Sequence, residues 1–411
     1  MTEAAPSCRS CGATGLQTFL SLGKTPLADA LVPVGQDPRD EKYYPLDVAF
    51  CGSCSLVQAL EEVPADVLFG PSYPYFSSFS DQLLKHSKEH VQRLISERSL
   101  DENSFVVELA SNDGYLLRNF VAAGIPCVGI EPTPGPAAAA RAIGVPTVSE
   151  FFDIRLARKL VRDGGRADVI IANNVMAHVP ALNSFVEGMA HLLADDGVIT
   201  VENPYVRDLV AHYEFDTIYH EHFCYYSCTS VAVLAERHGL YLNDVEYFPH
   251  LHGGTLRWYL EKRPQPSAAV EAFLRAEAEA GMTTIAYYAD FADKVEEVKR
   301  GLLNLLLALK SDGATIAAYG AAAKGSTLLN YTGIDRSLID FVVDRNVHKQ
   351  GMLMPGVHIP IVAPEALVER RPDYTLLLAW NFIDEVRRQQ AEYLAAGGQF
   401  IVPIPRPRVV Q

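Results

Sequence analysis

The sequence predicts an α/β protein with more than one domain, and three observations lead to that prediction. The chain has 411 residues, whereas a single domain typically holds roughly 100–200. Two stretches, beginning at Ser104 and at Ala314, each read as strand, turn and helix, which is the pattern of a sheet covered by helices. Near the N-terminus, four cysteines stand in two Cys-x-x-Cys pairs, which indicate a small separate module.

The composition is that of an ordinary globular protein, with 49% hydrophobic and 21% charged residues and a formal net charge of −15. We expect no nucleic-acid partner, because phosphate backbones require a basic surface. The N-terminus lacks the basic and apolar regions of a signal peptide, and no apolar run reaches the roughly 18–20 residues of a membrane helix. We therefore expect a cytoplasmic protein with no membrane partner. We also expect the protein to be a monomer.

The two cysteine pairs, Cys8 with Cys11 and Cys51 with Cys54, predict a structural zinc site. Each pair turns back so that both thiolates face one cation, and two pairs supply the four-sulfur shell that zinc takes in closed sites. Four sulfur ligands leave no open coordination position, so this Zn2+ is expected to be structural and not catalytic. A redox role is the alternative, but two such pairs near one terminus disfavour it.

The segment 104–131 predicts the first strand–helix–strand unit of a central domain. FVVELA has the length of a buried strand, SNDG is a turn, YLLRNFVAAG is a helix that ends at Gly124, and PCVGIEP is a second strand with Glu131 at its end. A carboxylate at that position can bind both ribose hydroxyls of an adenosine. The stretch FFDIRLARKL, the strand ADVIIANNV, a helix at Leu182–Leu193 and the strand GVITVENP follow.

The loop ELASNDG fits S-adenosylmethionine (SAM) better than NAD. It offers one glycine and no basic residue for a pyrophosphate, whereas SAM has no phosphate and carries a positive sulfonium. An α/β domain with some other ligand is the alternative. The expected cofactor contacts come from this loop, from the end of the second strand and from the Asn-Asn pair after a later strand: Glu108, Ala110, Asn112, Asp113, Gly114, Glu131, Pro132, Asn173 and Asn174.

The C-terminal third predicts helices over 265–300 that bridge domains, followed by a second Rossmann-like domain. ATIAAYGAAAKGSTLLNY reads as strand, small-residue turn and helix, and a helix N-terminus attracts phosphate oxygens. An NAD site is possible on shape, although YGAAAKGS lacks the paired early glycines, and a domain retained for packing is the other alternative. Strand ends of such sheets bind ligands, so the candidate contacts are Tyr319, Lys324, Ser326, Thr327, Asn330, Asp344, Lys349, Trp380 and Asn381.

These motifs together resemble the zinc-containing sugar C-methyltransferases. CxxC…CxxC, YPYFSSFS, VVELASNDGYLL, GIEPTPG, ANNVMAHV, FDTIYHEHFCYYS, HGGTLRWYL and AAYGAAAKGSTLLNY occur in that family's order over roughly residues 8–405. The family methylates nucleotide-linked keto-deoxysugars in antibiotic and surface-glycan pathways. The resemblance implies a zinc module (1–70), a class I Rossmann-like SAM methyltransferase domain (71–260), and a helical bridge with a Rossmann-like domain (261–411) that helps to hold the nucleotide sugar.

Methylation of carbon requires a base, because a ring carbon beside a ketone becomes nucleophilic only when its proton is removed and the enolate oxygen is stabilised. Histidine suits this role, since its ordinary pKa of about 6.5 lies near working pH. The resemblance implies that His222 is the base, with Tyr219 and Glu221 orienting the sugar or the imidazole. It also makes His178 a contact to a sugar oxygen and a candidate enolate stabiliser. His220 receives no role.

The resemblance implies that the segment YPYFSSFS covers the cofactor and the substrate. We expect Tyr73 to contact the cofactor, Tyr75 to lie at the reaction centre, and Ser77 and Ser78 to contact the substrate. The expected substrate is a 4-keto-6-deoxysugar linked to dTDP or GDP and methylated at C3. Methylation at C5 is the nearest alternative, because a C4 ketone acidifies the protons on both carbons.

Other interpretations remain open at this point. If His220 and His222 alternate along a strand, they share one face and could bind a metal together with a third ligand from elsewhere. The same histidines and tyrosines could instead form a packed aromatic cluster. For the whole chain, the rivals are a nucleotide-sugar oxidoreductase that uses NAD and a zinc-ribbon scaffold that docks partners.

Overall fold

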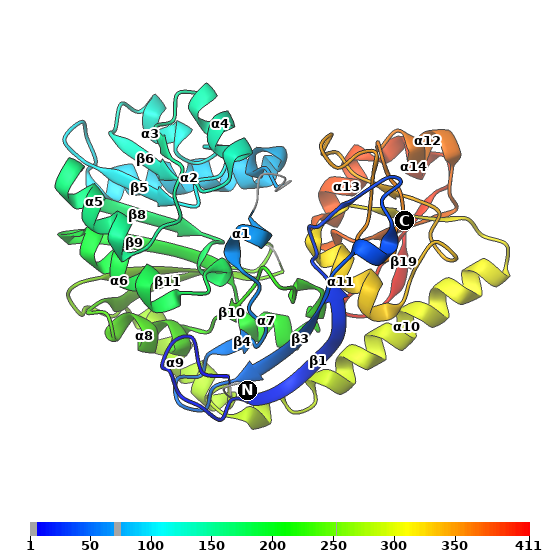
Figure 1. Cartoon of the computed structure of the whole chain (residues 1–411), viewed down its shortest axis with the longest axis horizontal. Coiled ribbons are helices and arrows are strands. Elements are labelled where there is room, and N and C mark those ends of the chain that lie inside the picture. Colours follow the sequence, from blue (N-terminus) through cyan, green and yellow to red (C-terminus); the bar gives the residue numbers. More distant parts are fainter. Residues whose placement is uncertain (1–5, 70–74, 252) are drawn as a thin grey trace.

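The computed structural model describes residues 6–69, 75–251 and 253–411, and it confirms the α/β fold (Figure 1). A central domain, on the left in Figure 1, contains a seven-stranded sheet in the order β11-β12-β9-β8-β5-β6-β7. Strands β9 to β7 pair in parallel, and β12 pairs antiparallel with β9 and β11. The strands are β5 (Val106–Leu109), β6 (Cys127–Ile130), β7 (Thr147–Val148), β8 (Ala167–Asn173), β9 (Leu193–Pro204), β11 (Tyr241–Phe248) and β12 (Thr255–Glu261).

Helices cover this sheet, as expected for parallel strands joined by crossovers. They are α2 (Asp81–Arg98), α3 (Arg118–Ala122), α4 (Pro134–Ala142), α5 (Ile154–Gly164), α6 (Leu182–Leu192), α7 (Val206–Ala211) and α8 (Cys228–Glu236). Helix α3 is shorter than predicted from YLLRNFVAAG. The backbone before it takes positive φ at Asn112 (50°) and Gly114 (77°), which delays the first helical turn until Arg118.

The C-terminal domain, on the right in Figure 1, has a six-stranded sheet in the order β16-β14-β13-β17-β18-β19. The strands are β13 (Ile316–Tyr319), β14 (Val342–Val343), β16 (Ile361–Val362), β17 (Tyr374–Leu377), β18 (Gln399–Val402) and β19 (Arg408–Val410). Its helices are α11 (Ala323–Thr332), α12 (Ala366–Arg370), α13 (Ile383–Gln389) and α14 (Ala391–Ala395). Before it, α9 (Ala268–Glu279) packs on α8 and β11, whereas α10 (Phe291–Ser311) packs on α11.

The N-terminal module contacts both domains. Its strands β1 (Gln17–Pro26), β3 (Tyr43–Phe50) and β4 (Val57–Ala59) form a sheet that β10 (Cys224–Tyr225) of the central segment completes. Strand β2 (Val32–Pro33) pairs instead with β15 (Met352–Leu353) of the C-terminal third. In Figure 1, β1 and β3 run between the two large domains, and the short helix α1 (Ala65–Leu68) lies beside the central one. None of the described helices is long and apolar enough to cross a membrane.

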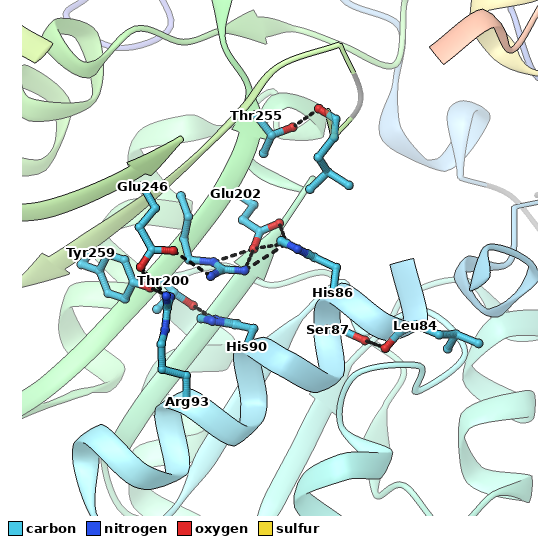
Figure 2. A network of polar contacts seen from close by, with 12 residues as sticks. Leu84, His86, Ser87, His90, Arg93, Thr200, Glu202, Glu246, Thr255 and Tyr259 are labelled. Carbon is cyan, nitrogen blue, oxygen red and sulfur yellow. Dashed lines mark hydrogen bonds and ion pairs between the residues drawn. The ribbon is translucent and has the colours of Figure 1, made fainter. Parts of the chain in front are cut away.

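A buried ionic network ties α2 to the central sheet (Figure 2). Glu202 of β9 is fully buried, and Arg257 of β12 donates from Nε to its Oε1 at 2.6 Å. His86 of α2 places Nε2 3.1 Å from both Glu202 oxygens. A second ion pair joins Arg93 of α2 to Glu246 of β11 at 2.6 Å. The network fixes the position of α2, whose first turns face the cavity described below.

Replacing Arg257 with Met is expected to destabilise the protein by about 3–5 kcal/mol, because Glu202 would keep a buried charge without its partner. Burial alone raises the pKa of Glu202, but Arg257 and His86 outweigh burial and lower this pKa to about 2. Urea unfolding measures the loss. The control is Arg263→Met, the same change in an exposed ion pair with Asp196, for which we expect little effect. Equal losses in both variants would contradict the prediction.

Candidate functional site

A cavity of about 570 Å³ lies where the three parts of the chain meet. The carboxyl ends of β5, β6, β8 and β9 form one wall, which is the edge where open parallel sheets bind ligands. Loops after β13, β14 and β17 of the C-terminal domain form the opposite wall. The start of α2 and the residues before it contribute a third side, and Asp29, Ala65 and Phe69 reach in from the N-terminal module.

The predicted cofactor loop lines the first wall. Six of the candidate residues face the cavity: Ala110, Asn112, Glu131, Pro132, Asn173 and Asn174. Ala110, Asn112 and Asn174 take positive φ of 54°, 50° and 52°, so the backbone here is held in a conformation that only surrounding contacts can maintain. Glu131 supplies such a contact, because its Oε2 accepts from the Asn112 backbone N–H at 2.9 Å.

The other cofactor candidates lie behind this wall or outside the described residues. Glu108, Asp113 and Gly114 are not among the described residues that line the cavity. Burial raises the pKa of Glu108 well above its ordinary value, which favours a neutral carboxyl. Asp113 accepts from the Ser78 backbone N–H at 3.1 Å and so holds the covering segment. Tyr73 falls in the stretch that the structure does not describe.

The two main walls differ in charge. Among the described lining residues between 75 and 260, the charged side chains are all carboxylic acids: Glu131, Asp153 and Glu221. The C-terminal wall contributes three cations, Lys324, Arg345 and Lys349, together with two carboxylic acids, Asp344 and Glu385. A cationic sulfonium with no phosphate fits the first wall, and the cations of the second wall can pair with an anionic group. The donor and acceptor set on the first wall therefore fits SAM.

The FDTIYHEHFCYYS segment is not the strand that the metal interpretation required. It begins with a 3-10 helix, η4 (Phe215–Thr217), continues through a turn, and becomes a strand only at Cys224. His220 is buried and places Nε2 3.0 Å from the Pro45 carbonyl oxygen, whereas His222 lines the cavity. Among the described residues, the group that could hold a metal ion consists of the four N-terminal cysteines.

The hydrogen bonds of His222 decide which of its ring nitrogens carries the proton. Its Nδ1 lies 2.8 Å from the Thr217 carbonyl oxygen, which can only accept, so Nδ1 carries the proton. In the neutral ring Nε2 is then unprotonated, and it lies 3.0 Å from the Tyr219 hydroxyl, which can donate to it. The Tyr219 and His222 ring centroids are 4.1 Å apart, and the His178 ring lies 4.7 Å from His222.

Two further candidates beside His222 are neutral over much of the working pH range. Burial lowers the pKa of His178 to about 4. Burial, reinforced by the nearby Asp29 carboxylate, raises the pKa of Glu221 to about 8. Glu221 Oε1 accepts from the Asp29 backbone N–H at 3.4 Å, and its Oε2 is buried without a hydrogen-bond partner in the described protein. Tyr75 lines the cavity on the side of the covering segment.

Six of the residues predicted to contact the substrate line the cavity: Ser77, Tyr319, Lys324, Asp344, Lys349 and Asn381. Lys324 donates to Asn381 Oδ1 at 3.1 Å, and its ammonium lies 4.7 Å from the Trp380 ring centroid. Lys349 is buried, donates to the Ala321 carbonyl oxygen at 2.7 Å and lies 3.7 Å from Asp29 Oδ1. Its charge is therefore already compensated within the protein.

The remaining substrate candidates make contacts inside the protein and are not among the described lining residues: Ser78, Ser326, Thr327, Asn330 and Trp380. Ser326 donates to the Ala28 carbonyl oxygen at 2.8 Å, and Thr327 donates to that of Ile218 at 3.1 Å. Asn330 donates to the Ser326 carbonyl oxygen at 2.8 Å. This differs from the prediction, because the second turn of α11 faces neighbouring segments and only its first residues face the cavity.

The four cysteines converge as the zinc prediction requires. All four Sγ atoms lie within 4.8 Å of one another, with Cys8 and Cys54 at 3.5 Å and Cys11 and Cys51 at 3.5 Å. A tetrahedral shell with Zn–S distances of about 2.3 Å has sulfur–sulfur separations of about 3.8 Å. The cluster therefore fits a structural zinc ion.

Comparison with known proteins agrees with this geometry. Family profiles match a domain expected to bind zinc at 8–69, a methyltransferase domain at 83–245 and a C-methyltransferase C-terminal domain at 250–405. The C-methyltransferase NovU from Streptomyces niveus is 37% identical over 410 residues, which cover 98% of this chain and 96% of NovU. The chain belongs to the zinc-containing C-methyltransferases. This confirms a SAM-dependent C-methyltransferase and disfavours both the oxidoreductase and the scaffold interpretations.

Solved structures align with a smaller part of this C-methyltransferase. Magnesium protoporphyrin IX methyltransferase (ChlM) from Synechocystis PCC 6803 with bound SAM is 12% identical, with a TM-score of 0.34 over 44% of this chain and 79% of that chain. A S-adenosylmethionine-dependent methyltransferase from Clostridium acetobutylicum is 11% identical, with a TM-score of 0.35 over 45% of this chain and 92% of that chain.

Sequence reasoning missed four charged residues of the C-methyltransferase that line the cavity: Asp29, Asp153, Arg345 and Glu385. Arg345 directly follows the predicted Asp344 at the end of β14, so the strand-end rule could have found it. Asp29 contacts Glu221 across 192 positions of the chain. No local pattern in the sequence signals that contact.

The raised pKa of Glu221 predicts a pH-dependent stability for the C-methyltransferase. Between the ordinary pKa of 4.5 and the folded pKa of about 8, the folded state holds a proton that the unfolded state has lost. The free energy of unfolding therefore falls as pH rises through this window. Glu221→Gln cannot ionise, so its Tm should fall less than the wild-type Tm between about pH 5 and 9. Parallel Tm profiles for the two proteins would contradict this assignment.

Proposed function

We propose that this C-methyltransferase methylates C3 of a 4-keto-6-deoxysugar linked to a nucleotide, dTDP or GDP. The observation that carries the proposal is the unprotonated Nε2 of His222, a base held at the cavity between an acidic wall and a wall that carries three cations. The cations of the C-terminal wall suit a nucleotide diphosphate. In this proposal residues 1–70 form the zinc module, 71–260 the SAM domain, and 261–411 the bridge and the nucleotide-sugar domain.

In the proposed reaction the Tyr219 hydroxyl turns from His222 Nε2 toward the sugar, and Nε2 then takes the proton from C3. The C–H electron pair moves into an enolate beside the C4 ketone. Nδ1–H keeps its bond to the Thr217 carbonyl oxygen and stabilises the imidazolium that forms. SAM supplies an electrophilic methyl group to the carbon. We assign the enolate contact to neutral donors, Glu221 or His178, because a charged carboxylate would repel the developing oxyanion.

The proposed cofactor residues hold SAM from the first wall. Glu131 is placed to accept from ribose hydroxyls, since its carboxylate oxygens lie at the strand end where dinucleotide folds place that acid. The backbone around Asn112 and the Asn173–Asn174 pair form the rest of the cradle. Tyr219 and Tyr75 orient the sugar, and Lys324 with Asn381 faces the diphosphate.

Deuterium uptake from heavy water tests the proposal directly. Wild-type protein is incubated with a nucleotide-linked 4-keto-6-deoxysugar without SAM, and NMR locates any label on the ring. Label at C3 is the expected result, because the base should make that proton exchange. Label at C5 would favour the alternative position. A protein that binds SAM but labels neither carbon would overturn the proposal.

A further inference from the structure

We infer that the C-terminal domain positions the catalytic base, with Trp380 and Thr327 acting as positioning residues for His222. This inference rests on the proposed role of His222. Both side chains were expected to contact substrate from the sequence, but neither is among the described residues that line the cavity. Their hydrogen bonds instead go to the segment that carries the base.

The contacts flank the residue that orients the imidazole. Trp380 Nε1–H donates to Asp216 Oδ2 at 2.7 Å, and Thr327 Oγ1–H donates to the Ile218 carbonyl oxygen at 3.1 Å. Thr217 stands between these two anchored residues, and its carbonyl oxygen receives Nδ1–H of His222 at 2.8 Å. Two side chains of the C-terminal domain therefore anchor the residues on both sides of the acceptor that sets the tautomer and direction of the ring: one binds the Asp216 side chain and the other the Ile218 backbone.

Packing supports the same connection. Phe215, at the start of η4, meets Tyr331 of α11 edge to face with ring centroids 5.2 Å apart. Asp216 is fully buried, and burial raises its pKa to about 6, an effect that Lys324 and the Trp380 donor oppose. Loss of that donor would leave a buried carboxylate short of a partner, which favours movement of η4.

The anchor also borders the proposed nucleotide side of the cavity. The Lys324 ammonium lies over the Trp380 ring at 4.7 Å and itself lines the cavity. The Trp380 indole thus contacts both Lys324, where a group in the cavity could bind, and the Asp216 anchor. Since catalysis depends on placement of reacting atoms within fractions of an ångström, small shifts of this anchor should act on the base more than on SAM binding.

The test compares Trp380→Phe and Thr327→Val with Thr327→Ser. Phe keeps an aromatic ring beneath Lys324 but removes the N–H donor, Val removes the hydroxyl, and Ser restores it. We expect kcat to fall by about 10- to 100-fold in the first two variants. Deuterium uptake into the keto-sugar should slow by the same factor, while SAM bound per protein and the KM for SAM stay unchanged. Thr327→Ser should stay near wild type.

Two results would overturn the inference. One is an unchanged kcat and exchange rate in both Trp380→Phe and Thr327→Val. The other is a fall in SAM bound per protein that matches the fall in kcat, since this would indicate a loss of folded protein and not a misplaced base. The proposed function fails separately: in that case the wild-type protein itself would exchange no ring proton.

Discussion

Replacing His222 with Asn is expected to lower methyl transfer by roughly 10²–10⁴-fold, because the change removes the only proton acceptor that the proposed mechanism uses. The Asn side-chain amide can still donate to the Thr217 carbonyl oxygen, so the local hydrogen bond has a replacement. SAM binding should persist, since its proposed contacts lie on other loops, around Asn112 and Glu131. Single-turnover methyl transfer and calorimetric SAM titration measure the two effects.

The matched control is His220→Asn, which makes the same chemical change two positions earlier. His220 is buried against the Pro45 carbonyl oxygen and is not among the described residues that line the cavity, so kcat per folded protein should stay near wild type. The base would be misassigned if His222→Asn stayed active while Glu221→Gln or His178→Asn lost turnover. His178 is the nearest rival, with its ring centroid 4.7 Å away.

Local patterns in the sequence predicted the elements whose structure depends on neighbours along the chain. Apolar runs located β5, β6, β8, β13 and β17, and the strand-end rule brought Asn112, Glu131, Asn173 and Lys324 to one cavity. The cysteine spacing located the zinc cluster for the same reason, because a Cys-x-x-Cys turn sets its own geometry.

The sequence could not show which face of an element another segment covers. Ser326 and Thr327 follow a loop that lines the cavity. Their hydroxyls nevertheless donate to carbonyl oxygens of the N-terminal module and of the segment 215–222. Glu108 and Asp113 stand in the predicted cofactor loop, but the fold turns both behind the cavity wall. Contacts of this kind depend on how distant segments pack, which no local spacing encodes.

The N-terminal module gives the strongest example of such long-range dependence. Its sheet is completed by β10, which begins two residues after His222, and its β2 pairs with β15 of the C-terminal third. Asp29 reaches the cavity beside Glu221. The zinc site takes no part in the chemistry of methyl transfer. Its loss should still affect catalysis, because the module packs against the segments that line the cavity.

Replacing Cys54 with Ser is expected to release zinc and to unfold the N-terminal module. The binding free energy of a structural four-ligand zinc site is folding free energy, with apparent values of about 10–16 kcal/mol in small zinc peptides. Because β4 pairs with β10, unfolding should also loosen the residues that follow His222 and reduce methyl transfer. Metal analysis, soluble yield and single-turnover rates measure the three consequences, and Cys8→Ser should behave in the same way.

Cys127→Ser is the matched control, since Cys127 is a buried cysteine of β6 outside the metal cluster. It should retain one zinc per chain and an N-terminal module that resists proteolysis. If Cys54→Ser also kept its full metal content, the four-sulfur assignment would be wrong. If it lost zinc but kept full methyl transfer, the pairing of β4 with β10 would not transmit the loss to the cavity, and the module would have to stabilise the chain without holding the site.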